Sequence, residues 1–229
     1  MKNVTKLVLV FVLAGISFTG CKNTEADKKE TTETTDTTTE AKSEIADKTS
    51  VVLNANLATE AELNTLGLSA ETVAQILEQR PFVNMEDLDA LITNVDKEAL
   101  YKNVFVPFNL NTTEEANFKM IPGVGEKMAH EFEEYRPYTS VKQFKREIGK
   151  YVDDAEVERY LNYIFVPVEL NTASEEDIKA LPGVGNKMAH EFEEYKPYSS
   201  LAQFRKEIGK YVDDKELKRL ERFVYLSEK

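Results

Sequence analysis

The sequence contains a single cysteine, Cys21, and only two histidines, His130 and His190. A disulfide needs two cysteines, so this sequence cannot build an internal disulfide framework, and its fold must depend on a hydrophobic core. The histidines lie sixty residues apart and have no cysteine partner, so a zinc site would require two distant segments to converge. No pairing of a nucleophile with a base is recognisable. We therefore expect no metal site, no cofactor and no enzymatic activity.

Basic residues are also in short supply, with 29 lysines and arginines against 41 acidic residues and a formal net charge of −12. Non-specific affinity for DNA comes mainly from basic side chains that neutralise phosphates, so this balance weighs against DNA binding.

The sequence also lacks a series of segments with the pattern of β-strands. The short β-rich runs at 105–108 and 165–168 contain proline and suit extended linkers that add strand-like contacts between neighbouring units. The fold class that we predict is all-α.

Residues 1–20 have the order of an export signal: a short basic region, the apolar run 7–18, and small residues before Cys21. The apolar run is too short for a comfortable transmembrane helix. The stretch Phe18-Thr19-Gly20-Cys21 resembles a bacterial lipobox. That resemblance implies lipidation at Cys21 and anchoring of a lipoprotein to a membrane of the bacterial cell envelope. The alternative is an ordinary secreted protein with a stray cysteine.

Residues 21–50 are rich in threonine and glutamate and contain almost no apolar side chains. Burial of such a segment cannot offset the entropy lost on ordering it, so we expect a disordered tether.

The remaining chain is organised around one stretch that occurs twice. Pro122-Gly123-Val124-Gly125 and its following helix recur sixty residues later as Pro182-Gly183-Val184-Gly185. The units 109–168 and 169–229 align without a gap, and 51–108 is a degenerate copy in which the turn reads Leu66-Gly67-Leu68-Ser69. An atypical first copy is typical of a capping unit in a repeat array.

A Pro-Gly-x-Gly turn ends one helix and begins another, because glycine permits the reversal and proline cannot continue the first helix. In the second unit we predict four helices, at about 113–121, 125–135 and 140–148 and from Asp153 onward. Thr112 is the expected N-cap of the first, with Glu115 as its capping-box partner. The side chains expected on the buried stripe of the second helix are Val124, Met128, Phe132 and Tyr135. We place Glu131, Glu133 and Glu134 on its solvated face.

The turn and its flanks resemble the helix-hairpin-helix motif. Asn109-Leu110-Asn111-Thr112 and Leu170-Asn171-Thr172-Ala173 precede their turns as the opening "L-N-T-A" does in ComEA-type competence proteins. The resemblance implies DNA binding without sequence preference, in which amides at a helix N-terminus hold a phosphate. The implied phosphate-binding residues are Pro122, Gly123, Val124, Gly125 and Lys127 in one hairpin and Pro182, Gly183, Val184, Gly185 and Lys187 in the other.

Two hypotheses remain open for the function. One is a lipid-anchored, DNA-binding envelope protein of the competence type. The other is a structural or protein-interaction lipoprotein that keeps the scaffold and binds an envelope protein partner instead of DNA. The first unit, with three basic and nine acidic residues, is the least suited to DNA. Two basic stretches, 142–150 and 205–222, either line the hairpins or balance neighbouring glutamates.

Overall fold

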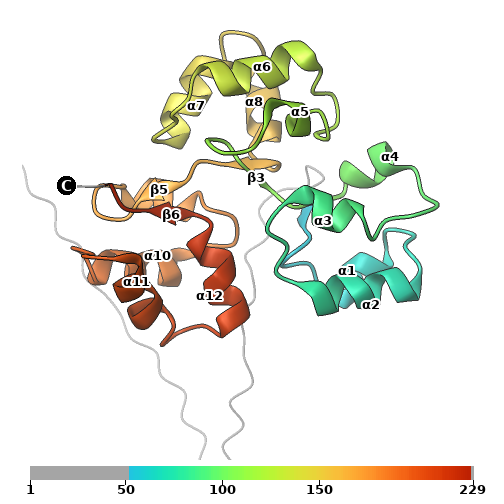
Figure 1. Ribbon diagram of the computed structural model, residues 1–229. Coiled ribbons are helices and arrows are strands. Elements are labelled where there is room, and N and C mark those ends of the chain that lie inside the picture. The colour runs from blue at the N-terminus through green and yellow to red at the C-terminus, as the bar shows by residue number, and fades with distance from the viewer. Residues whose placement is uncertain (1–51, 228–229) are drawn as a thin grey trace, which may run out of the picture. The chain divides into compact units, whose positions relative to one another are not determined.

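A computed structural model describes residues 52–227, which form twelve short helices and six two-residue strands (Figure 1). The predicted signal segment, the tether and Cys21 lie outside the described residues. Across residues 52–227, no helix has the length and apolar character needed to cross a membrane.

The described chain consists of three four-helix segments, each of which begins and ends with a strand. The first segment contains β1 (Leu53–Asn54), α1 (Glu60–Asn64), α2 (Ala70–Gln79), α3 (Met85–Asp89), α4 (Lys97–Tyr101) and β2 (Val104–Phe105). The second contains β3 (Phe108–Asn109), α5 (Glu115–Phe118), α6 (Glu126–Glu134), α7 (Val141–Ile148), α8 (Asp154–Tyr160) and β4 (Ile164–Phe165). The third contains β5 (Val168–Glu169), α9 (Glu175–Lys179), α10 (Asn186–Glu194), α11 (Leu201–Ile208), α12 (Asp214–Glu221) and β6 (Val224–Tyr225).

The strands close each segment on itself. β1 pairs in parallel with β2, β3 with β4, and β5 with β6, so the first and last residues of every segment lie side by side (Figure 1). The runs at 105–108 and 165–168 do connect successive segments, as expected. The expectation of strand-like contacts between units was wrong, because the strands pair within each segment, and the mostly helical fold includes three small parallel pairs. Each pair joins residues more than fifty positions apart, for example Phe108 with Ile164.

Most helices begin where a side chain caps them. Ser140 caps α7 and Asp153 caps α8, each accepting a hydrogen bond from an amide three residues on. The predicted first helix of the second unit starts later than expected, at Glu115 rather than at residue 113. Thr112 is not its N-cap, because the Thr112 and Thr113 amides both donate to the Asn109 carbonyl and form a turn instead.

An asparagine fixes the start of each segment to the middle of the same segment. The Asn111 side chain donates to the carbonyl oxygen of Tyr138 at 2.8 Å and accepts from its amide at 2.8 Å. Asn171 makes the same two bonds to Tyr198, and Asn56 makes them to Phe82. A buried backbone amide and carbonyl need such partners, so this pairing explains the asparagine in the opening motif.

The core is formed by the predicted apolar stripe. Phe132 and its counterpart Phe192 are fully buried, and the Phe132 ring packs edge-on against Phe118 and Tyr160. Buried residues of the first two segments form one continuous cluster, and those of the third segment form a second cluster together with Phe165.

Candidate nucleic-acid interface

The two Pro-Gly-Val-Gly stretches form matching turns between α5 and α6 and between α9 and α10. Gly123 and Gly183 have φ values of 82° and 71°, in the left-handed region that favours glycine. The Val124 amide donates to the Ile121 carbonyl at 2.9 Å, and Val184 makes the equivalent bond. Since these amides are bonded internally, Val124 and Val184 contribute buried side chains to the turn rather than free donors.

The helices that follow the turns have no side-chain cap. Gly125 is the N-cap of α6 and Gly185 is the N-cap of α10. Within residues 52–227, the amides from Gly125 to Met128 have no protein acceptor, and neither do those from Gly185 to Met188. Unbonded amides at a helix N-terminus, together with the helix dipole, make a site that suits an anion such as phosphate.

The first segment has the same turn with its helix end occupied. Gly67 keeps a positive φ of 74°, but the N-cap of α2 is Ser69, whose hydroxyl accepts from the Thr72 amide at 3.1 Å. The serine oxygen takes the place that a phosphate oxygen would take. This geometry agrees with the prediction that the first hairpin is the least suited to DNA.

The hairpin lysines, Lys127 and Lys187, are exposed, and neither forms an ion pair with any residue in 52–227. The two helix ends differ in one charge. Glu126 occupies the first position of α6 and pairs with Lys119 at 3.8 Å, whereas α10 begins with the neutral Asn186. An acidic residue in the first turn opposes an incoming phosphate, so the third segment offers the more favourable helix end.

Most cations of the two basic stretches are paired with glutamates. In the second segment, Arg146 pairs with Glu147 at 2.6 Å, and Lys145 and Lys150 also have glutamate partners. In the third segment, Arg205 pairs with Glu221 at 2.5 Å. The structure therefore places much of this charge in local ion pairs, which reduces what is available to DNA.

An arginine from the fourth helix of each of the last two segments supports the hairpin, a role that the sequence analysis missed. Arg219 on α12 donates to the Pro182 carbonyl at 2.5 Å, and a Cβ on Gly123 would lie 3.4 Å from the Arg159 guanidinium. Both arginines follow their proline by 37 residues, and this shared spacing was the signal that could have identified them.

Residues of the first segment lie beside both hairpins. A Cβ on Gly183 would collide with Leu57 Cδ1, so this exposed leucine lies directly against the third-segment turn. Glu98 on α4 lines a 510 Å³ cavity together with Gly123 and Gly125 of the second-segment turn. One hairpin thus has an apolar neighbour and the other an acidic one.

The two histidines each lie near a glutamate. His130 Nδ1 lies 3.2 Å from a Glu115 carboxylate oxygen, and His190 lies 3.9 Å from Glu194. In the part of the chain that the structure describes, no three His, Cys, Asp or Glu side chains gather as metal ligands would. Glu131 and its counterpart Glu191 are buried, so the prediction that Glu131 lies on a solvated face was wrong.

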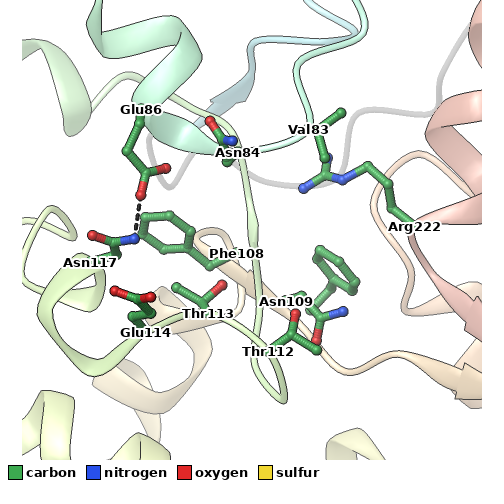
Figure 2. A pocket seen from close by; sticks show the side chains of 11 residues that line it. Val83, Asn84, Glu86, Phe108, Asn109, Thr112, Thr113, Glu114, Asn117 and Arg222 are labelled. Carbon is green, nitrogen blue, oxygen red and sulfur yellow. Dashed lines mark hydrogen bonds between the residues drawn. The ribbon is translucent and has the colours of Figure 1, made fainter.

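A 410 Å³ cavity lies where the three segments meet (Figure 2). Glu86 and Asn117 are hydrogen-bonded on one side of it, and Arg222 lies on the other. Arg222 donates to the backbone carbonyls of Phe82 and Pro107, and burial lowers its pKa to about 10. Among residues 52–227, neither histidine nor cysteine lines this cavity. Arg222 of the third segment connects to the first segment through its bond to Phe82.

Comparison with protein families identifies a helix-hairpin-helix motif over residues 164–225, which covers β4 and the third segment. This motif is commonly found in proteins that bind DNA without sequence specificity. Searches of curated proteins and of solved structures returned no match for the chain.

Proposed function

We propose that this chain is a non-enzymatic, lipid-anchored envelope protein that binds DNA without sequence preference through the hairpins at 122–125 and 182–185. The three segments are tandem copies of one helix-hairpin-helix unit, of which the first has become a capping unit. The likeness to ComEA-type competence proteins makes DNA uptake the process in which such binding would serve.

The observation that carries the proposal is the contrast between three equivalent helix ends. Ser69 accepts from the Thr72 amide in the first turn of its helix, whereas the equivalent amides of Met128 and Met188 have no protein acceptor in residues 52–227. Packing alone does not require this difference, because a Cβ at Gly125 or Gly185 would meet no atom within 4 Å. A glycine at these positions suits close approach of a phosphate.

A second candidate function rests on the neighbours of the hairpins. Leu57 lies on the Gly183 turn, and Glu98 borders the Gly123 turn. If the first segment permanently occupies both turns, the protein is a structural or protein-interaction lipoprotein that retains the scaffold.

The test is a titration of the full chain with two DNA duplexes of unrelated sequence, starting at roughly 50 mM salt, where electrostatic binding is strong. The wild-type protein should bind both duplexes with similar affinity. Lys127→Ala with Lys187→Ala should weaken binding to both, and the salt slope should fall by about 0.9 for each phosphate that the variant no longer neutralises.

Lys142→Ala with Lys215→Ala is the matched control, because it removes the same charge from exposed lysines that form no ion pair within residues 52–227. If the control weakens binding as much as the hairpin variant, DNA is not held at the hairpins. Absence of wild-type binding to either duplex at this salt concentration would favour the scaffold function.

The anchoring proposal rests on Cys21, which lies outside the described residues. Acylation with more than one chain would hold the protein stably on a membrane, where a single chain is marginal. Cys21→Ser should therefore move the protein from the membrane fraction to the soluble fraction. Retention of this variant in the membrane fraction would contradict lipid anchoring.

A further inference from the structure

The second and third segments each carry a tyrosine pair at the end of the hairpin helix opposite the turn. The Tyr135 and Tyr151 hydroxyls lie 2.7 Å apart, with ring centroids separated by 6.4 Å. Tyr195 and Tyr211 repeat this arrangement with the same two distances. Tyr151 and Tyr211 remain 38% and 40% exposed, although they are large aromatic residues. Each pair therefore presents an aromatic surface to the solvent.

A buried carboxylate lies beside each pair. Glu131 and Glu191 are each only 8% exposed, and the Oε2 atom of each is buried without a hydrogen-bond partner among the described residues. An unpaired carboxylate oxygen in such a position is costly unless a donor reaches the group. Glu131 lies one helical turn before Tyr135, so its carboxylate shares a face of α6 with the tyrosine pair. The pKa of Tyr151 is raised, first by Tyr135 and then by Glu131, in agreement with this proximity.

The flanking charges indicate what kind of ligand suits this site. Lys150 Nζ lies 4.7 Å from the Tyr135 ring centroid and pairs with Glu147, and Lys210 lies 5.0 Å from Tyr195. Each glutamate partner is shared with a second cation, Arg146 for Glu147 and Lys206 for Glu207, so one net positive charge remains beside each tyrosine pair. This charge opposes a cationic ligand and favours an anionic backbone. A neutral group with a flat face and a hydrogen-bond donor, attached to a phosphate chain, satisfies the aromatic surface, the carboxylate and the lysine together.

The first segment lacks both the glutamate and the helix tyrosine of this cluster. Counted from the helix N-cap, Gln75 occupies the position of Glu131, and Gln79 occupies that of Tyr135. The tyrosine–glutamate cluster therefore occurs only in the two segments whose hairpin has an uncapped helix, as far as residues 52–227 show.

We infer that each cluster is a nucleobase site for single-stranded DNA, in which a base stacks on Tyr151 or Tyr211 and donates its exocyclic amino group to Glu131 or Glu191. This inference deepens the proposed function, on which it rests. The helix α6 has nine residues, so the cluster lies about 13 Å from the turn, within reach of one strand of a few nucleotides. Cytosine offers an amino group to a carboxylate, whereas the corresponding edge of thymine carries a carbonyl oxygen.

The test measures binding of labelled oligo(dC), oligo(dT) and a duplex to the full chain. Tyr151→Ala with Tyr211→Ala should weaken oligo(dC) binding at least about fivefold, since base stacking contributes this much or more, and should leave duplex binding unchanged. Tyr151→Phe with Tyr211→Phe keeps the rings and should retain most of the affinity. Glu131→Gln with Glu191→Gln should abolish the preference for oligo(dC) over oligo(dT).

Circular dichroism melting of every variant separates loss of binding from loss of folding. The inference is overturned if a folded Tyr→Ala variant binds oligo(dC) as the wild type does. The hairpin variant Lys127→Ala with Lys187→Ala distinguishes the two proposals. Tyrosine-dependent binding of single strands without any duplex binding supports the base site and contradicts the hairpin site; the reverse pattern overturns the base site alone.

Discussion

The guanidinium of Arg219 donates a hydrogen bond of 2.5 Å to the carbonyl oxygen of Pro182, which joins the last helix of the third segment to its hairpin. The same guanidinium forms two bonds to Glu216, at 2.7 and 2.6 Å. Arg159 makes the equivalent pair with Glu156 in the second segment. Their burial differs, because the Arg219 side chain is 2% exposed and that of Arg159 is 31% exposed.

Replacement of Arg219 by alanine should destabilise the protein by about 2–3 kcal/mol, because the variant cannot form the hydrogen bonds of this charged group and leaves the Pro182 carbonyl without its donor. The matched change Arg159→Ala should cost less, about 1–2 kcal/mol, because this half-buried guanidinium is more solvated and its hydrogen bonds go to Glu156 alone among residues 52–227. Urea denaturation of the two variants measures the difference. Destabilisation by Arg219→Ala no greater than that by Arg159→Ala would contradict an added contribution from the Pro182 bond.

How far the sequence predicts this fold depends on the range of the interactions. The helix at 125–135 was predicted to within one residue at each end, because a local turn and a local apolar stripe define it. The strand pairs and the Asn111–Tyr138 bonds were not predicted, since they join positions 27 or more residues apart and carry no local pattern. The sequence therefore predicts turns and helices that short stretches define, but it does not predict the strand pairing that joins the two ends of a segment.

At the candidate site, too, the sequence predicted the local features and missed the long-range contacts. The sequence located both hairpins and their lysines, because glycine and proline mark a turn. It did not indicate that Leu57 lies against Gly183, because that contact joins residues 126 positions apart. It also placed Glu131 in solvent, because glutamate is rarely buried and nothing local showed that Tyr151 lies beside it.

Phe132→Ala and Phe192→Ala should each cost about 3–5 kcal/mol, since both rings are fully buried and truncation leaves a cavity. The first and second segments share one core, so we expect Phe132→Ala to lower the stability of both. Phe192→Ala should act on the third segment, whose core is separate. Hydrogen exchange followed by segment measures this, and a uniform decrease in protection in both variants would contradict two separate cores.

The pKa of His130 is raised, mainly by its hydrogen bond to Glu115 and by the charge of that carboxylate. Because the folded-state pKa lies above the unfolded value of about 6.5, protonated His130 favours the folded state. This contribution is fully present below the unfolded pKa and is lost as pH rises through the folded pKa. A nuclear magnetic resonance titration should show the raised pKa, and Glu115→Gln should lower it. An identical titration curve in this variant would assign the shift to other groups.

The sharpest test of the hairpins is to give them the cap that the first segment already has. Gly125 and Gly185 have extended backbones, with φ values of −91° and −85°, and a Cβ there meets no atom within 4 Å. Serine can therefore enter both positions without strain and cap its own helix, as Ser69 does. Stability should stay the same or rise by a few tenths of a kcal/mol.

DNA binding should change in the opposite direction. In Gly125→Ser with Gly185→Ser, the hydroxyls should accept from the Met128 and Met188 amides, as Ser69 accepts from Thr72, and occupy the place of a phosphate oxygen. Affinity for duplex DNA should therefore fall while the melting temperature is preserved. Ser69→Gly is the converse control, and it should not raise affinity, because Glu71 stands in the first hairpin where Lys127 stands in the second. Anisotropy titration beside thermal melting separates the two effects. Undiminished affinity in a stably folded double-serine variant would show that the helix ends do not hold phosphate.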